Sequence, residues 1–338
     1  MGSSQRLRLI LVILFSLLLA LVAVLFLIRP APASLLNPLG NPTPTPTPKP
    51  LLKYTFTNLK QTPPQASQLS LDSLLSQTPT YHTWIFSYTT EGKKMTGQLN
   101  VPVLATPSAG FPTIVLLRGY VDPAVYTTGM GTKNAAAVFA QNGYATLAPD
   151  FLGFGGSDPP AINTLAARLE KPKHVLDLLV SLSTLSFLDS DHLGIWAHSN
   201  GGQIALSVLE ISGKTIPTTL WAPVSKSFPY SVLYYTDESA DQGKDLRQVL
   251  ADFEANYDVY DFSIDRYFEW LKAPVQIHQG TNDDAVPVEW SQALAKSLEK
   301  TNQNITLYIY PGADHNLQPA WNAVIARDLS FFHNHLLN

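Results

Sequence analysis

The 338-residue sequence contains no cysteine. Without cysteine there can be no disulfide framework, no thiolate metal site, no cysteine nucleophile and no lipid-bearing cysteine. Charge is sparse as well, because charged residues make up 14% of the chain and the formal net charge is −4. No basic arm or patch stands out, so we expect no nucleic-acid partner.

Motifs that would bind a cofactor are absent too. The sequence shows no internal repeat, no P-loop, no dinucleotide fingerprint and no carboxylate–histidine metal motif. His333 and His335 stand two positions apart on an expected helix, so their side chains point to different faces and make a poor metal pair. We therefore expect neither a cofactor nor a metal. The chain is 45% hydrophobic, which is enough for one large domain with its own core.

The longest apolar run covers residues 9–28, near the N-terminus. About 20 apolar residues span a bilayer core, and Arg6 and Arg8 precede the run, which favours a cytoplasmic N-terminus. We therefore expect residues 1–29 to form a single transmembrane anchor, with the rest of the chain outside the cytoplasm. A cleaved signal peptide followed by secretion is the alternative, because Ala31–Ala33 resembles a cleavage site.

Residues 30–50 are rich in proline and threonine and include an alternating Thr-Pro segment. Proline lacks a backbone N–H and fixes φ, so this segment can form neither a helix nor a sheet. We expect an extended polyproline II linker that holds a folded domain away from the membrane. A tail without a spacing role is the alternative. The composition becomes globular from Leu51, so the folded domain is expected over residues 51–338.

Strand and helix patterns alternate along this folded part. Residues 82–90 and 95–103 are rich in β-forming residues and flank the turn sequence EGKK, which predicts an antiparallel hairpin. Further strands are expected at 112–119, 144–150, 192–197, 215–224, 274–280 and 305–312, and helices at 132–143, 165–185, 200–210, 290–300 and 322–337. This alternation predicts an α/β fold with a mostly parallel eight-stranded sheet and helices on both faces.

Ser199, Asp283 and His315 each stand in the loop directly after an expected strand. The carboxyl ends of parallel strands meet at one sheet edge, where open α/β sheets bind their ligands. A serine needs a base to remove its proton, histidine has a suitable pKa near neutral pH, and a carboxylate orients the imidazole. We therefore expect a catalytic triad. Each residue by itself also has a simpler interpretation. The serine could cap a helix, the aspartate could belong to a turn, and the histidine could occupy a surface or core position.

The order Ser, Asp, His resembles that of the α/β-hydrolase superfamily. The segments APVQIHQGTNDDAVPVEWSQALAKSLEK and ITLYIYPGADHNL resemble the C-terminal part of the prolyl-oligopeptidase (S9) catalytic domain and of dienelactone-hydrolase-like esterases. In that pattern two residues separate the aspartate from the glycine that ends the strand, and two more separate it from a Val-Pro pair, which selects Asp283 over Asp284. The resemblance covers roughly residues 80–338. It implies the α/β-hydrolase fold and a serine hydrolase activity.

Two positions depart from this resemblance. Ala197 replaces the first glycine of the usual Gly-x-Ser-x-Gly turn, and Arg118 replaces a histidine that the family usually carries after the corresponding strand. The resemblance still implies an oxyanion hole made by the backbone N–H groups of Asn200 and Tyr120. Arg118 is interpreted either as a structural ion-pair residue or as the partner of a substrate carboxylate.

Residues 225–272 interrupt the alternation of strands and helices and are rich in aromatic residues. Insertions at this place commonly act as a cap over the pocket of a hydrolase. We expect a small cap insertion whose aromatic residues, among them Tyr234 and Tyr235, either wall a substrate pocket or anchor the insertion to the body.

These features predict a membrane-tethered serine hydrolase that cleaves carboxylic ester or amide bonds through an acyl-enzyme. Peptidases of the S9 family usually carry an N-terminal propeller, and the segment between the linker and residue 82 is too short for one. An esterase acting on small acyl esters is therefore slightly preferred over an S9-like peptidase acting on short peptides. A non-catalytic α/β-hydrolase-like binding module is a third alternative.

Overall fold

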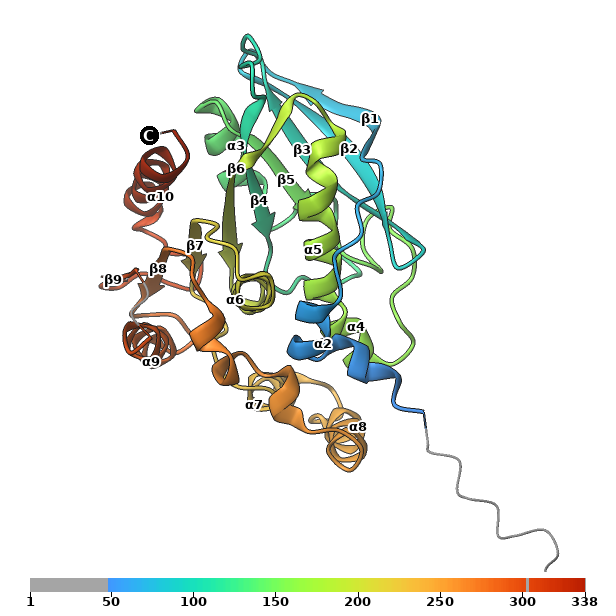
Figure 1. The fold of residues 1–338 in the computed structure, drawn as a ribbon. Helices are drawn as coiled ribbons and strands as arrows, with labels where there is room; N and C mark the ends of the chain where they lie inside the picture. The colour runs from blue at the N-terminus through green and yellow to red at the C-terminus, as the bar shows by residue number, and fades with distance from the viewer. Residues whose placement is uncertain (1–47, 302–303, 338) are drawn as a thin grey trace, which may run out of the picture. The chain divides into compact units, whose positions relative to one another are not determined.

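The protein is described here by a computed structural model, which covers residues 48–301 and 304–337 (Figure 1). Contacts divide the chain after Pro48, and Lys49–Asn338 forms one unit. The predicted anchor at 1–29 and most of the predicted linker at 30–50 lie outside the described residues. Within the described ranges, no helix combines the length and the apolar character that crossing a membrane requires.

A nine-stranded mixed sheet organises this unit, in the order β1-β2-β3-β5-β4-β6-β7-β8-β9. The pairings that run from β1 to β5 are antiparallel, and all the others are parallel. The strands are β1 (Ser70–Gln77), β2 (Tyr81–Thr90), β3 (Lys93–Pro102), β4 (Phe111–Leu117), β5 (Ala145–Pro149), β6 (Leu188–His198), β7 (Thr218–Trp221), β8 (Val275–Gly280) and β9 (Ile305–Tyr310). The predicted mostly parallel α/β sheet is thus confirmed.

The sheet has one strand more than the eight that the sequence predicts. The additional strand is β1, which pairs with β2 at the edge of the sheet and is mostly exposed. Its register with β2 shifts twice, between Leu71 and Ser73 and between Leu74 and Ser76. Each irregularity breaks the two-residue alternation of side chains. The sequence pattern therefore does not reveal β1 as a strand.

The predicted hairpin is confirmed as β2 and β3. Glu91 and Gly92 form its turn, with φ of 48° and 76°. Positive φ at both central residues is the signature of the type I′ turn, which matches the natural twist of an antiparallel pair.

Helices cover both faces of the sheet (Figure 1). One face packs against α3 and α10, and the other against α5, α6 and α9. Along β4, Ile114 and Leu116 join the first core while Val115 and Leu117 join the second, because successive strand side chains point to opposite faces. The helices are α2 (Phe56–Gln61), α3 (Lys133–Gln141), α4 (Thr164–Leu169), α5 (Lys171–Ser181), α6 (Asn200–Ser212), α7 (Tyr230–Leu233), α8 (Lys244–Glu254), α9 (Val288–Glu299) and α10 (Trp321–Leu336).

The helix predicted at 165–185 divides into α4 and α5, and a 3-10 turn, η2 (Leu182–Thr184), follows α5. Pro172 occupies the second position of α5. A proline fits the first turn of a helix, where its missing N–H would have no intrahelical partner, but it cannot stand in a helix interior. The chain therefore begins a new helix at Lys171.

The insertion at 225–272 folds into α7, α8 and four 3-10 turns, namely η3 (Thr236–Glu238), η4 (Val259–Phe262), η5 (Ile264–Arg266) and η6 (Phe268–Trp270). Phe253 packs against Phe228 and Phe262, with ring centroids 5.4 and 5.1 Å apart. Tyr267 stacks at 5.0 Å on Phe56 of α2, which follows η1 (Pro50–Tyr54) near the start of the unit. Part of the aromatic set therefore anchors the insertion, as one of the two sequence interpretations expects.

Candidate active site

Ser199 lies on a sharp turn between β6 and α6. Its backbone has φ 55° and ψ −122°, although it is not a glycine. Backbone hydrogen bonds hold this conformation: the Ser199 N–H donates to the Trp221 carbonyl at 2.9 Å, and the Ser199 carbonyl accepts from Gly202 at 2.9 Å and from Val224 at 3.0 Å. The side chain makes no capping hydrogen bond to α6. The helix-cap interpretation of Ser199 therefore finds no support.

Two glycines allow the turn to pack tightly. A Cβ atom at Gly201 would collide with the carbonyl of Leu117 at the end of β4, and one at Gly202 would lie 2.6 Å from Cβ of Pro223. Ala197, in place of the first motif glycine, is fully buried and packs within the core beside α6. A methyl group is tolerated there because the close backbone approach falls after the serine, not before it.

His315 and Asp283 are in direct contact. The His315 Nδ1 atom lies 2.9 Å from each carboxylate oxygen of Asp283. The carboxylate also accepts hydrogen bonds from the N–H groups of Ala285 and Val286 and from the Gln279 amide, at 2.8–2.9 Å. Burial alone would raise the pKa of Asp283, but the hydrogen bond with His315, followed by those from Val286 and Gln279, outweighs burial and holds the pKa below its ordinary value. Asp283 is therefore ionised and fixed in place.

The Ser199 hydroxyl forms no hydrogen bond with His315 in this structure, although both residues are partly accessible to solvent at the same edge of the sheet. Catalytic hydrogen bonds often form only when substrate is bound. The structure thus brings His315 and Asp283 together and leaves the serine hydroxyl available.

His198 is a residue of this site that the sequence analysis did not identify. Its Nε2 lies 2.9 Å from the carbonyl oxygen of His315, and the two rings are 4.7 Å apart. Burial, and secondarily the nearby His315, lowers the pKa of His198 to about 4. His198 is therefore neutral at physiological pH, and its Nε2–H can donate to the His315 carbonyl. This contact holds the loop that carries His315 against the nucleophile turn.

The expected oxyanion groups lie next to Ser199. Asn200 is the first residue of α6, where backbone N–H groups have no intrahelical acceptor. A Cβ atom at Gly119 would lie 2.9 Å from Cβ of Ser199, so the backbone leading to Tyr120 runs close beside the serine. Tyr120 is 78% exposed. We therefore consider only its backbone N–H as a group of the site. Their role as an oxyanion hole stays a prediction.

Arg118 is buried below this loop. Its guanidinium donates to the carbonyls of Gly119 at 3.0 Å and Asp150 at 2.9 Å. The group also lies over the rings of Tyr126 and Phe154, at 4.5 and 4.1 Å. These contacts favour the structural interpretation of Arg118. Its partners are backbone carbonyls and aromatic rings, however, and not the carboxylate of the expected ion pair. Because Arg118 is buried, a substrate carboxylate has little access to its guanidinium.

Two further cations lie close to the site and carried no signal in the sequence. Arg168 Nη1 is 3.5 Å from Oδ1 of Asn200, and Lys171 Nζ lies 5.5 Å from the centre of the Phe151 ring. Burial, followed by the positive charges of Arg168 and Arg118, lowers the pKa of Lys171 to about 7. Arg168 therefore brings a positive charge next to the nucleophile turn, whereas the charge of Lys171 changes near neutral pH.

The predicted substrate residues Tyr234 and Tyr235 lie in the cap beside Trp290. Their rings are 4.8 and 6.5 Å from the Trp290 ring. The Tyr235 hydroxyl donates to the carbonyl of Ala285 at 3.1 Å, two residues after Asp283. This aromatic group therefore connects the cap to the aspartate loop, and Tyr234 remains 40% exposed at its surface.

A pocket of about 220 Å³ lies beside the histidine loop. Its lining includes His198, Trp196, Trp221, Trp321 and Asn316, the residue after His315. A larger pocket, of about 500 Å³, is lined by residues that include parts of η1, α4 and α8, and neither pocket has Ser199, Asp283 or His315 in its lining.

Comparison with known proteins identifies a family and several relatives of this chain. Residues 131–338 match the family model described as the prolyl oligopeptidase family. An inferred dipeptidyl aminopeptidase of Schizosaccharomyces pombe is 27% identical over 166 residues, which cover 48% of this chain and 18% of that relative. An inferred carboxymethylenebutenolidase of Escherichia coli is 24% identical over 195 residues, which cover 56% of this chain and 64% of that relative. The chain thus spans less than two thirds of each relative.

A solved structure supports the fold. The ferulic acid complex of Est1E from Butyrivibrio proteoclasticus matches with a TM-score of 0.56 and 17% identity, over 75% of this chain and 99% of that chain. At this identity the likeness bears on the fold, which is that of the α/β-hydrolases. Because the family model covers most of the chain, including all three strand-end residues, the chain belongs to the prolyl oligopeptidase family of serine hydrolases.

Proposed function

We propose that Ser199, His315 and Asp283 form the catalytic triad of a hydrolase that cleaves carboxylic ester or amide bonds. The observation that carries the proposal is the contact of His315 Nδ1 with the buried Asp283 carboxylate, at 2.9 Å, beside the strained turn at Ser199. A carboxylate on Nδ1 leaves the other ring nitrogen, Nε2, to accept the serine proton.

The reaction proceeds through an acyl-enzyme. His315 takes the hydroxyl proton while the Ser199 oxygen attacks the acyl carbon, and Asp283 stabilises the imidazolium without itself becoming protonated. The N–H groups of Asn200 and Tyr120 donate to the oxyanion of the tetrahedral intermediate. The imidazolium then protonates the leaving alcohol or amine. Water, activated by His315, hydrolyses the acyl group and restores the serine.

Small acyl esters are the preferred substrates. In support, the fold of this chain matches Est1E over 99% of the Est1E chain, and the Est1E structure contains bound ferulic acid. The alternative, an S9-like peptidase acting on short peptides, is supported by the family model and by the aminopeptidase relative.

A fluorophosphonate probe tests the triad on the full chain in detergent. We expect the wild type to be labelled and Ser199→Ala to lose labelling and about 10³-fold or more of its esterase activity. Ser212→Ala is the matched control, since Ser212 ends the same helix and donates to the Leu209 carbonyl. Labelling that survives in Ser199→Ala would place the nucleophile elsewhere, and an unlabelled wild type would favour the non-catalytic module.

Measuring kcat/KM for acyl p-nitrophenyl esters and for aminoacyl anilides distinguishes an esterase from a peptidase. We expect a much higher kcat/KM for short-chain esters than for anilides. Comparable values for the two series would instead favour the peptidase.

We also propose that residues 9–28 anchor the protein in a membrane, with the hydrolase unit outside the cytoplasm. The apolar run and the preceding arginines support this. Membrane fractionation tests it: the full chain should resist extraction at alkaline pH, whereas a chain lacking residues 1–47 should remain in the supernatant. A mature N-terminus shortly after residue 33 would show that the segment is a cleaved signal peptide.

A further inference from the structure

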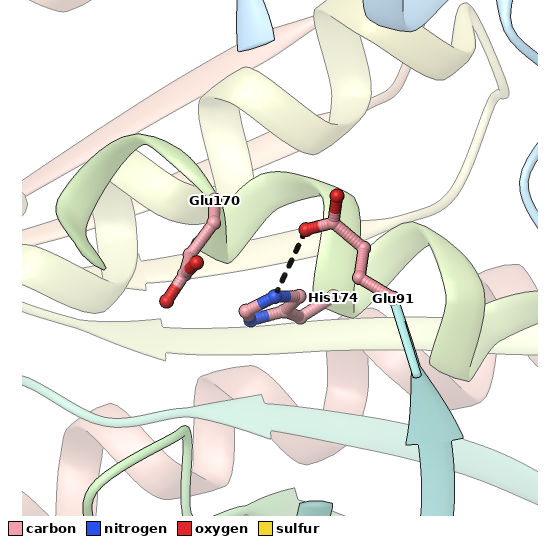
Figure 2. A group of neighbouring side chains, drawn as sticks. All are labelled: Glu91, Glu170 and His174. Carbon is pink, nitrogen blue, oxygen red and sulfur yellow. Dashed lines mark ion pairs between the residues drawn. The ribbon is translucent and has the colours of Figure 1, made fainter. Parts of the chain in front are cut away.

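A second cluster of ionisable side chains shares no residue with the triad. Glu91 stands in the turn between β2 and β3, Glu170 lies at the junction of α4 and α5, and His174 lies in α5. Figure 2 shows the two glutamates on either side of the imidazole ring. One potential ligand atom from each residue lies within 4.8 Å of the other two.

His174 is the unusual member of this cluster. Its side chain is only 1% exposed, yet neither ring nitrogen has a hydrogen-bond partner among the described residues. Leaving a buried polar nitrogen without a partner is costly. The Nε2 atom faces Oε2 of Glu91 at 3.6 Å, which is too long for a hydrogen bond. The ring therefore offers a nitrogen lone pair between two carboxylates.

The spacing fits two ligands on one metal ion. Zn²⁺ binds imidazole nitrogen and carboxylate oxygen at about 2.0–2.2 Å, so neighbouring ligands of a tetrahedral site lie about 3.3–3.5 Å apart. The 3.6 Å between His174 and Glu91 is close to that separation. Glu170 would reach the same ion after a rotation of its side chain. Its Oε1 is held by a long contact, 3.5 Å from the N–H of Ala161.

The surroundings also suit a divalent cation. The two glutamates supply two negative charges, and Glu170 is 4% exposed. Lys53 pairs at 2.7 Å with Oε1 of Glu91, the oxygen opposite the one that faces His174, so this ion pair can persist. The hydroxyl of Tyr54 donates a hydrogen bond to Oε2 of Glu91 at 2.8 Å and helps to fix this oxygen in place.

We propose that Glu91, Glu170 and His174 bind a divalent transition-metal ion, with Zn²⁺ the best match, in a structural site. One imidazole and two carboxylates are ligands that Zn²⁺ accepts. The ion would tie the β2–β3 turn to α5 and, through Lys53 and Tyr54, to the first turn of the folded unit. The sequence predicts no metal site here. Glu170 and His174 stand four positions apart, and they form a set of three possible ligands only because the fold brings Glu91 next to them.

Zn²⁺ binding is measured on the full chain in detergent, after treatment with EDTA, by competition with a chromogenic chelator. We expect a single Zn²⁺ per chain and a higher thermal unfolding midpoint when it is bound. Glu91→Gln and Glu170→Gln keep the side-chain size and should each weaken Zn²⁺ binding by about tenfold or more. His333→Ala, which removes an exposed histidine, should leave binding unchanged and controls for surface sites.

A proton is the competing occupant, because an imidazolium at His174 would also pair with the two carboxylates. NMR spectra of the histidine ring nitrogens distinguish the two. In the metal-free chain at pH 8, a doubly protonated His174 ring together with no Zn²⁺ binding at micromolar concentration would overturn the proposal. Zn²⁺ affinity that is the same in both glutamine variants as in the wild type would also overturn it, since the ion would then bind elsewhere.

Discussion

Ser199 combines an unfavourable backbone conformation with an available hydroxyl. A non-glycine residue with φ 55° and ψ −122° costs about 1–3 kcal/mol relative to a relaxed conformation. The backbone bonds to Trp221, Gly202 and Val224 hold it there. Strain at this residue is expected when the turn must project a nucleophile beyond the strand end. A serine that only capped the helix would instead bond to α6.

Ser199→Gly should therefore stabilise the protein while abolishing its activity. Glycine adopts positive φ without steric cost, so we expect the free energy of unfolding to rise by about 1 kcal/mol. Ser199→Ala is the control, because it removes the hydroxyl and retains the strain. Urea unfolding of both variants measures the difference. Equal stabilities of the two variants would argue against strain at the turn.

Glu210 makes stability depend on pH. It is fully buried in α6, and neither carboxylate oxygen has a hydrogen-bond partner among the described residues. Burial, aided by the negative charge of Asp265, raises the pKa of Glu210 well above its ordinary value. A raised folded-state pKa means that stability declines as the pH rises above the unfolded value of about 4.3.

Glu210→Gln removes this titration with little change of shape. We expect the variant to be more stable than the wild type at pH 8 and close to it at pH 4, as measured by urea unfolding at the two pH values. A difference in stability that is the same at both pH values would contradict a raised pKa of Glu210.

At the scale of elements, the site depends on how closely α6 approaches the end of β4. Gly201→Ala would force a methyl group into the carbonyls of Leu117 and Arg118. We expect a loss of about 1–3 kcal/mol in stability and a lower kcat, because the strand end and the turn must separate. Gly156→Ala is a milder control, since its Cβ would meet the flexible side chain of Thr96 at 3.2 Å. An unaffected kcat in Gly201→Ala would show that the turn can relax.

The elements that the sequence predicts well are those with a local signature. The hairpin is confirmed because its two strands are rich in β-forming residues and flank a short turn in which Gly92 adopts positive φ without steric cost. The parallel strand β4 is confirmed because it is buried on both faces and its sequence is a mostly apolar run. β1 escapes prediction because its bulges break the alternation, and the helix break at Pro172 follows from proline chemistry.

At the scale of the whole molecule, α2 near the start of the folded unit packs against the cap insertion at 225–272. Phe56 is 4% exposed and stacks on Tyr267 of the insertion, although the two are far apart in the sequence. Phe56→Ala should lower the free energy of unfolding by about 3–5 kcal/mol and make the cap more susceptible to limited proteolysis. Tyr260→Ala, in a side chain that is 59% exposed, should have little effect. If both variants behave alike, the N-terminal segment does not support the cap.

The sequence by itself determined the α/β alternation and selected Ser199, Asp283 and His315 as candidates. Strand and helix periodicities are local, and parallel strands necessarily bring their carboxyl ends to one edge. Only the tertiary structure decided which side chains surround these three. His198 meets the carbonyl of His315 across 117 positions, Arg168 reaches Asn200 across 32, and Glu91 faces His174 from another element. These contacts depend on the packing of distant segments, which no local pattern encodes.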